Sequence, residues 1–489
     1  MNTHAFSWMR GRAGRYAAAL GAGVVALSAV TPAAARPLMA GLVAGFSRWR
    51  GRSRVLTLAA AAAMLAVGLA ATPAAAATAS ITLKPASGPP TTKVTVNGAG
   101  FGASETVAVD FSSTQVATGT TSSTGTFSET FTVPKSALPG KHPVTATGQT
   151  SGLSATAYFL VRTNWAQFHF SPANSGFNPY ENVISPANVP GLKLAWTNNS
   201  AGSIGSSPAV ASGVLYVGTQ FNGLLAFSAA GTGCSGSPVT CNPMWTGTIP
   251  AQAVTSPAVA GGVVYTTAAD GKLYAFRAAG CGAATCNPLW TGAIMSNSQS
   301  APTVAGGVVY VTSGSSLYAF RAAGCGAATC NPLWTGTAVF GVTGGSAPAV
   351  SGGKVYVSAY KGVAAFSAAG CGSATCNPLW TGSTNIGGTT SSPAVSGGVV
   401  YVGVALGFAA YSAAGCGASA CNPLWTFSTG SEIVASPAVA NGVVYVPDTS
   451  GSTLYALSTA GTLLWTAASV NGSDSPAVAN GVVYAGSYS

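Results

Sequence analysis

The stretch Trp245–Phe276, WTGTIPAQAVTSPAVAGGVVYTTAADGKLYAF, contains the pattern that decides the fold. Its centre, Ser256–Tyr265, reads S-P-A-V-A-G-G-V-V-Y and returns along the chain with little change. A fixed period of this length predicts a repeat architecture with one supersecondary unit in each copy. Successive copies lie 49, 45, 46, 45, 44 and 39 residues apart, by subtraction of the positions of Pro208, Pro257, Pro302, Pro348, Pro393, Pro437 and Pro476.

The repeated unit predicts four short β-strands. The segment S-P-A-V is expected to form the inner strand, G-V-V-Y-V the second, L-Y-A-F the third and N-P-L-W-T the outer one. Apolar runs without strict alternation are typical of strands that are covered on both faces, as in stacked blades. One tryptophan recurs in each unit and is expected to fill the space between neighbouring blades, at Trp245, Trp290, Trp334, Trp380, Trp425 and Trp465.

Seven copies predict an all-β chain with a seven-bladed β-propeller, and an eight-bladed or incompletely closed ring is the alternative. The last copy reaches Ser489 after its second strand, so we expect an incomplete blade, with a truncated chain as the alternative. We expect Leu192–Thr197 to supply the outer strand of that blade. Residues 163–180 are the other candidate for filling the gap.

Residues 1–77 form the predicted signal and targeting region. Eight of the 19 basic residues lie before residue 55, where the chain has no acidic residue. Arg48–Arg54 fit the basic start of a signal peptide, Val55–Ala71 its apolar centre and Thr72–Ala77 its cleavage zone. We therefore expect a secreted protein, extracellular or at the cell surface. An uncleaved N-terminal anchor is the alternative and the one membrane contact that the sequence suggests.

Residues 78–162 form a separate predicted domain, a small Ig-like β-sandwich. Short apolar runs alternate with turn clusters, and the segment has neither a helical period nor a cysteine. The runs Pro85–Gly102 and Pro139–Gly148 resemble the IPT/TIG group of Ig-like domains, which implies a spacer or a binding module. From residue 78 onward the chain has 11 basic and 8 acidic residues, a net charge of +3 by subtraction. This balance argues against a nucleic-acid partner.

Residues 163–489 form the predicted propeller. The segments Trp165–Phe170, Asn178–Pro179 and Val189–Trp196 resemble the start of the PQQ-like β-propeller repeat family. Quinoprotein dehydrogenases of that family carry A-x-D-x-x-T-G-K-x-x-W, a vicinal cysteine pair and an acidic calcium site. The resemblance implies the scaffold without a cofactor, and PQQ with calcium is the alternative. A cysteine loop replaces the T-G-K turn here, and the aspartate is replaced by Ser228, Arg277, Arg321, Ser367, Ser412 and Ser458.

The ten cysteines occur as five close pairs, each between the third and outer strands of a repeat. An even count with one pair per repeat predicts local disulfides. Each would clamp a short hairpin loop and contribute about 2 kcal/mol. Zinc binding and redox chemistry are the alternatives, although zinc needs four ligands and redox pairs usually follow C-x-x-C. The pairs are Cys234/Cys241, Cys281/Cys286, Cys325/Cys330, Cys371/Cys376 and Cys416/Cys421.

Few residues have catalytic potential. After the targeting region the only histidines are His142, expected in a turn, and His169, expected to pack among aromatic residues. The acidic residues are scattered along the chain. Glu432 and Asp474 lie on successive loops and could form a paired-carboxylate glycosidase site. The alternative is that both carboxylates are solvated charges on loops and have no catalytic role.

The segments between each outer strand and the next S-P-A-V vary, whereas the framework is nearly constant. In a propeller they converge on one face, and their Ser, Thr, Asn and Gln suit a protein or glycan partner. The alternative is that these loops vary in sequence only because packing does not constrain them. The segments are Asn198–Ser206, Thr248–Thr255, Ala293–Ser300, Thr337–Ser346, Ser383–Ser391, Phe427–Ala435 and Ala467–Asp474. The candidate binding-face residues are Asn297, Ser298, Gln299, Phe340, Asn385, Glu432, Asn471 and Asp474.

The expected function is therefore that of an exported, non-enzymatic binding or scaffold protein at the cell surface. Its propeller face would meet a protein or a glycan. The alternative is a quinone-dependent or other enzyme that acts on sugars or alcohols.

Overall fold

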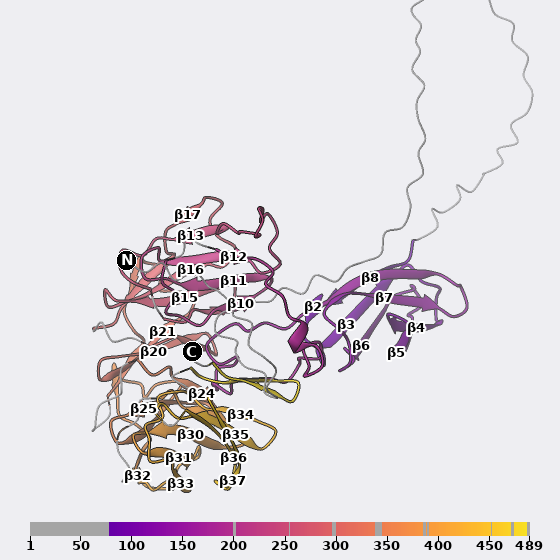
Figure 1. Cartoon of the computed structure of the whole chain (residues 1–489). Helices are drawn as coiled ribbons and strands as arrows, with labels where there is room; N and C mark the ends of the chain where they lie inside the picture. The colour runs from indigo at the N-terminus through magenta and orange to yellow at the C-terminus, as the bar shows by residue number, and fades with distance from the viewer. Residues whose placement is uncertain are drawn as a thin grey trace, which may run out of the picture.

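The computed structural model describes residues 78–198, 202–253, 255–295, 300–337, 345–384, 388, 391–450, 452–470 and 474–486. The predicted targeting region, residues 1–77, lies outside this part of the chain. The described residues form a small β-sandwich beside a larger ring of sheets (Figure 1). Their only helical element is the short 3₁₀ helix η1, Val189–Gly191. No helix among them is long and apolar enough to cross a membrane.

The β-sandwich has two antiparallel-based sheets, in the orders β1–β3–β6 and β2–β8–β7–β4–β5. Alternation decides which side chains enter its core. In β3, Val94 and Val96 are buried, whereas Lys93 and Asn97 are exposed. The strands are β1 (Ser80–Lys84), β2 (Ser87–Gly88), β3 (Lys93–Ala99), β4 (Thr106–Phe111), β5 (Thr114–Thr120), β6 (Phe127–Thr132), β7 (Gly140–Gly148) and β8 (Ser154–Val161).

The repeats fold as blades, which we number 1 to 7 in chain order. Blade 2 contains the stretch Trp245–Phe276 in part and is an antiparallel meander of four strands. Gly261 and Gly262 join its first two strands with φ of +57° and +77°. A two-residue turn with both φ positive matches the twist of the strands, and glycine adopts it without steric cost. Five of the six residues of the second strand are buried, because neighbouring blades cover both faces.

The four-strand unit predicted from the sequence is confirmed in blades 1 to 6. Blade 1 has β10 (Ala209–Ala211), β11 (Val214–Gly218), β12 (Leu224–Ser228) and β13 (Trp245–Gly247); blade 2 has β14 (Ala258–Ala260), β15 (Val263–Ala268), β16 (Lys272–Arg277) and β18 (Trp290–Ala293). Blade 3 has β19 (Thr303–Ala305), β20 (Val308–Ser313), β21 (Ser316–Arg321) and β23 (Trp334–Thr337); blade 4 has β24 (Ala349–Ser351), β25 (Lys354–Ala359), β26 (Gly362–Ser367) and β28 (Trp380–Ser383). Blade 5 has β29 (Ala394–Ser396), β30 (Val399–Val404), β31 (Gly407–Ser412) and β33 (Trp425–Ser428); blade 6 has β34 (Ala438–Ala440), β35 (Val443–Pro447), β36 (Thr453–Ser458) and β37 (Leu463–Ala468).

Blade 7 differs from the others. Within the described residues its sheet contains β38 (Ala477–Ala479) and β39 (Val482–Tyr484), together with β9 (Phe177–Asn178), which pairs in parallel with β38. Residues 163–180 therefore join this sheet through β9, but β9 lies beside the inner strand β38 and not in the place of the missing third strand, where it was expected. The other expectation fails in its detail, because Leu192–Thr197 is not part of this sheet. Thr197 instead pairs with Thr240 of blade 1.

The recurring tryptophan fills the space between blades, with one exception. Trp245, Trp290, Trp334 and Trp380 are buried, and each packs against an aromatic ring of the next blade. Trp465 of blade 6 remains 43% exposed. The third strand supplies this ring in blades 2 to 5, whereas blade 6 has Leu457 at that position and Trp425 is half-buried. The sheet of blade 7 lacks, within the described residues, a third strand altogether.

Candidate functional site

The propeller has two faces of different construction. The variable loops share one face with the hairpins between second and third strands, which we call the loop face. Two contacts show this, because Ala253 N donates to Thr219 O and Ala269 N to Gln252 O. The turns between first and second strands share the opposite face with the cysteine loops, and we call this the turn face. Ala278 N, for example, donates to Gly262 O across it.

Two of the predicted binding-face residues can be placed on the loop face. Glu432 and Asp474 are both exposed there, and the hypothesis of a paired-carboxylate site stays a prediction. The other predicted residues lie outside the described part of the chain, namely Asn297, Ser298, Gln299, Phe340, Asn385 and Asn471.

The loop face also exposes large apolar side chains. Three of them occupy hairpin tips between second and third strands, in blades 1, 4 and 5, and the fourth lies in the variable loop after blade 2. Sequence reasoning concentrated on the variable loops and missed the hairpin tips, although these segments also differ between repeats. The four residues are Phe221 (73% exposed), Met295 (91%), Tyr360 (69%) and Leu406 (50%).

The segment between sandwich and propeller plugs the channel at the centre of the ring. We call residues 164–178 the plug segment. It enters from the turn face, where Asn164 Oδ1 accepts a hydrogen bond from Ser212 N at 3.1 Å. It leaves through β9, which runs parallel to the inner strand β38. Between these points it follows the inner strands of the blades in their order around the ring.

The plug segment binds every blade in the same way. In each repeat the valine of S-P-A-V donates its backbone N–H to an acceptor of the plug segment. Six acceptors are backbone oxygens and the seventh is the side-chain Oε1 of Gln167. The donor–acceptor pairs are Val210 N with Trp165 O, Val259 N with Ala166 O, Val304 N with Gln167 Oε1, Val350 N with Pro172 O, Val395 N with Ala173 O, Val439 N with Ser175 O and Val478 N with Gly176 O.

Two polar side chains of the plug segment are buried at its centre. Asn174 donates through Nδ2 to Pro348 O at 3.0 Å and to Pro393 O at 3.1 Å, which ties blades 4 and 5. His169 lies in the left-handed region at φ +52° and stacks on Phe168, with ring centroids 4.4 Å apart. Burial lowers the pKa of His169 to about 4, although a hydrogen bond with Asn174 O opposes the shift. The expectation that His169 packs among aromatic residues agrees with this position.

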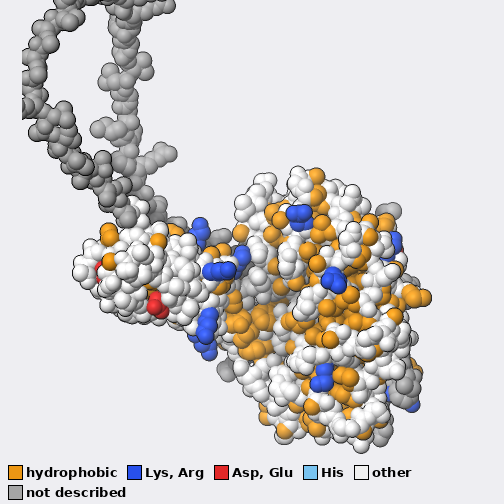
Figure 2. Space-filling model, turned by 180° about the vertical axis from the view of Figure 1, so that it is seen from behind, with side chains coloured by type: hydrophobic (Ala, Val, Ile, Leu, Met, Phe, Trp, Pro, Cys, Tyr) orange, Lys and Arg blue, Asp and Glu red, His pale blue; other side chains and the backbone are white. Residues whose placement is uncertain are grey.

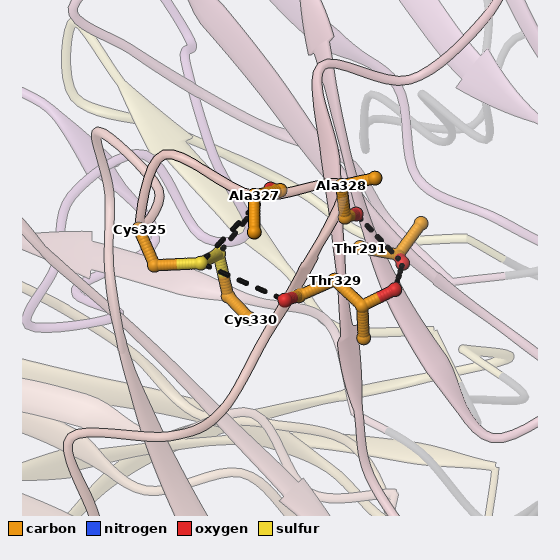
Figure 3. Close-up of a disulfide and its surroundings, with 6 residues drawn as sticks. All are labelled: Thr291, Cys325, Ala327, Ala328, Thr329 and Cys330. Atoms are coloured by element: carbon orange, nitrogen blue, oxygen red, sulfur yellow. Dashed lines mark hydrogen bonds between the residues drawn. A yellow bond between two sulfur atoms is a disulfide. The ribbon is translucent and has the colours of Figure 1, made fainter.

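All ten cysteines lie in the described part of the chain and form the five predicted disulfides. Figure 3 shows Cys325–Cys330, whose Cα atoms are 5.7 Å apart. The loop that it closes contains β22 (Thr329–Cys330), which pairs in parallel with β18 of the preceding blade. Thr291 N donates to Ala328 O at 2.8 Å across this pair. The same arrangement recurs in β17 (Thr285–Cys286), β27 (Thr375–Cys376) and β32 (Ala420–Cys421).

Each of these loops therefore joins two blades, whereas the sequence suggested only a clamped hairpin. Tyr265 Oη of blade 2 donates to Ala322 O of blade 3 at 2.8 Å, and burial raises its pKa to about 12. Gly324, just before the disulfide, packs on Trp290, so that a Cβ there would lie 2.6 Å from the indole Cδ1. The cysteine loop, the tyrosine and the tryptophan thus form one joint between successive blades.

The disulfide of blade 1, Cys234–Cys241, also differs from the clamped hairpin that the sequence suggested. Cys241 is buried, with 1% of its surface exposed, and belongs to the same apolar cluster as Leu215 and Phe227. Its backbone N donates to Thr197 O at 2.8 Å, and Thr197 N donates to Val239 O at 2.9 Å. Thr197 precedes the first blade, so this loop ties blade 1 to the chain that enters it. Cys241 is therefore a core residue at the joint where the ring begins.

The residues that the structure describes do not fit a quinone–calcium site. The hydroxyls next to the channel bond to the backbone of the next blade, as Thr267 does to Ser300 O and Thr312 to Ser346 O. The buried Asp448 stabilises its own hairpin, because its Oδ1 accepts a hydrogen bond from Thr453 N at 3.0 Å. Within the described ranges no three His, Cys, Asp or Glu side chains lie close enough to hold a metal ion. The acidic cage that calcium requires is missing from this part of the chain.

Two remaining residues of the sandwich also have structural roles. Glu105 accepts hydrogen bonds from Ser151 N and Oγ and from Thr150 N, and these bonds lower its pKa. His142 lies in β7, where the sequence suggested a turn, and stacks on Phe111 with centroids 4.9 Å apart.

Comparison with known proteins agrees with this architecture. Residues 76–161 match the macroglobulin-like domain family, so the β-sandwich is supported but not the IPT/TIG group specifically. No curated protein matches the chain. Among solved structures, BamB from Moraxella catarrhalis is 16% identical, with a TM-score of 0.46 over 60% of this chain and 83% of that one. The computationally designed Ika8 protein is 13% identical, with a TM-score of 0.40 over 53% and 72%.

The propeller itself is matched by a family. Residues 186–415 and 374–489, which together span more than half of the chain, match the PQQ-like repeat family described as outer membrane protein assembly factor BamB. The five disulfides are typical of a protein that folds outside the reducing cytoplasm. The chain belongs to this family of PQQ-like propellers, and it carries a macroglobulin-like β-domain in front of the ring.

Proposed function

We propose that this protein is an exported, non-enzymatic scaffold that presents the loop face of its propeller to a protein partner at the cell surface. The plug segment and the β-sandwich occupy the turn face, so the loop face is the side left for a partner. The observation that carries the proposal is the set of exposed residues there, Phe221, Met295, Tyr360 and Leu406. Aromatic side chains and methionine are enriched in protein interfaces.

Two further features support a scaffold over an enzyme. Disulfide loops join blades 1 to 5 in succession, which supports a rigid frame on which variable segments are displayed. The plug segment also crosses the channel, where seven of its oxygen atoms and the Nδ2 of Asn174 are used to hold the blades. A protein partner is favoured over a glycan on this face, because the exposed side chains are apolar and only Tyr360 among them carries a hydroxyl.

The test is site-specific crosslinking. A photoreactive amino acid at Tyr360, in protein secreted by the native host, should crosslink one defined surface protein. Replacing Phe221, Met295 and Leu406 by alanine in the same chain should reduce that crosslink at least tenfold.

A matched control is available on the outer rim. Leu289, Leu333 and Leu379 are about as exposed as Leu406 but lie beside the cysteine loops. Their replacement by alanine should leave the crosslink unchanged. Equal loss in both variants, or no crosslinked protein at all, would count against the loop face as the binding surface. Crosslinking to polysaccharide would instead identify a glycan partner.

A further inference from the structure

A second candidate site lies where the β-sandwich meets the plug segment. A cavity of about 290 Å³ opens there. One wall comes from the sandwich and includes β2, the proline after it and Arg162, which follows β8. The other wall comes from the aromatic residues of the chain that enters and leaves the ring. The lining residues are Ser87, Gly88, Pro89, Arg162, Thr163, Asn164, Phe170 and Tyr180. Cavities between domains are common positions for small-ligand sites.

The walls of this cavity are held in place by regular hydrogen bonds. On the sandwich side, Arg162 N donates to Gly88 O at 2.9 Å, and the Arg162 side chain donates through Nη2 to Ser87 Oγ at 3.2 Å. On the propeller side, Phe170 packs edge-on against Trp165, with ring centroids 5.3 Å apart. Trp165 is in turn paired with the inner strand of blade 1. A ligand would therefore meet a preformed site.

The surroundings of the cavity are positively charged. Arg162 makes no ion pair with a carboxylate of the described residues. The register of the strands brings Lys84, Lys93 and Lys141 to the same end of the sandwich as Arg162. Figure 2 shows lysine and arginine side chains gathered where the sandwich approaches the propeller. The acidic neighbour Glu181 remains a negative charge near these cations; its Oε1 accepts from Val183 N and Ile184 N at 2.8 Å, which holds the side chain on its own turn.

We propose that this cavity binds a carboxylate-bearing sugar residue of an acidic polysaccharide. The planar guanidinium of Arg162 matches a carboxylate through two parallel hydrogen bonds. The rings of Phe170 and Tyr180 offer apolar faces to the C–H bonds of a pyranose. Ser87, Thr163 and Asn164 carry groups that pair with sugar hydroxyls. The volume is at the lower limit of small-ligand pockets, about 300 Å³, and accommodates one sugar ring.

An acidic peptide fits these features less well. Extended peptides bind through a free strand edge or a long groove, and this cavity is short. The surrounding lysines would contact neighbouring acidic residues of the polysaccharide chain, whose charges repeat along its length.

Calorimetric titration of the exported protein with uronic acid oligosaccharides tests the proposal. Oligomers of galacturonate, glucuronate, mannuronate and guluronate form the panel, and the methyl ester of each provides an uncharged counterpart. At least one acidic oligomer should bind, and its ester should bind at least tenfold more weakly. Arg162→Gln should weaken binding at least tenfold, and Tyr180→Leu should weaken it several-fold.

The matched control is Arg321→Gln, which removes an exposed cation on a distant blade and should leave the affinity unchanged. Thermal unfolding of each variant shows whether it remains folded. The proposal is overturned if no acidic oligomer binds or if the esters bind equally well. Equal losses in Arg162→Gln and Arg321→Gln would also overturn it, since they indicate non-specific attraction. Equal binding of polyglutamate would show a general polyanion surface and not a sugar site.

Discussion

Acidification should destabilise the propeller through His169, whose ring is buried at the centre of the plug segment. Burial holds its pKa at about 4 in the folded protein, against 6.5 for the free side chain. Because the folded pKa is the lower one, the unfolded chain takes up the proton first as the pH falls. Stability from this group is therefore complete above pH 6.5 and is lost between about pH 6.5 and 4. Between pH 7.5 and 4.5 the loss amounts to about 2.5 kcal/mol.

Urea unfolding at pH 7.5 and 4.5, followed by tryptophan fluorescence, measures this loss. His169→Gln cannot titrate, so its stability should fall by about 2.5 kcal/mol less than that of the wild type over the same interval. The comparison uses differences within each variant, and any constant cost of the substitution cancels. An identical pH dependence of wild type and His169→Gln would refute the burial argument.

Three further outcomes are expected at the joints between blades. Gly324→Ala should lower the free energy of unfolding by several kcal/mol, because φ is +78° and the added Cβ would meet Trp290. Gly326→Ala, with φ of +84° and open space around it, should lower it by only about 1–2 kcal/mol. Similar urea midpoints for the two variants would contradict the contact with Trp290. Tyr265→Phe should lower the free energy of unfolding by about 1 kcal/mol, since its hydroxyl donates to Ala322 O, and an unchanged midpoint would show that this bond contributes nothing. Reduction and alkylation of the five disulfides should lower the free energy of unfolding by about 2 kcal/mol per loop, and calorimetry should show this as a lower melting temperature. An unchanged melting curve would show that the loops keep their structure without the disulfides.

The blades were predictable from the sequence because their determinants are local. The pair Gly261–Gly262 imposes a tight turn, and the apolar run after it must be covered on both faces. These features recur in every copy, so each copy supports the assignment of the others. The tryptophans were predictable for the same reason, although Trp425 is only half-buried and Trp465 is 43% exposed, where a covering strand is missing from the described part.

The channel and the joints were not predictable in the same way. The plug segment shows no period, and its main partners are backbone N–H groups that any residue provides. The pairing of Thr329 and Cys330 with the preceding blade involves two residues, which is too short to produce a sequence pattern. The cavity at Arg162 joins residues from two domains whose proximity depends on the whole fold. Phe221 and Tyr360 lie on tight hairpins, whose exposure follows from the ring and not from their neighbours in sequence.

The plug segment has a consequence for how this protein can evolve. Propellers gain and lose blades by duplication or deletion of a repeat, and nearly identical copies make such exchanges easy. Here a short stretch outside the repeats provides one acceptor for each valine N–H of the ring. An eighth repeat would bring a buried donor without a partner, at a cost of about 1–3 kcal/mol before any strain. The number of blades is thus fixed by two separate parts of this chain, the repeats themselves and the plug segment, whose acceptor oxygens equal the blades in number.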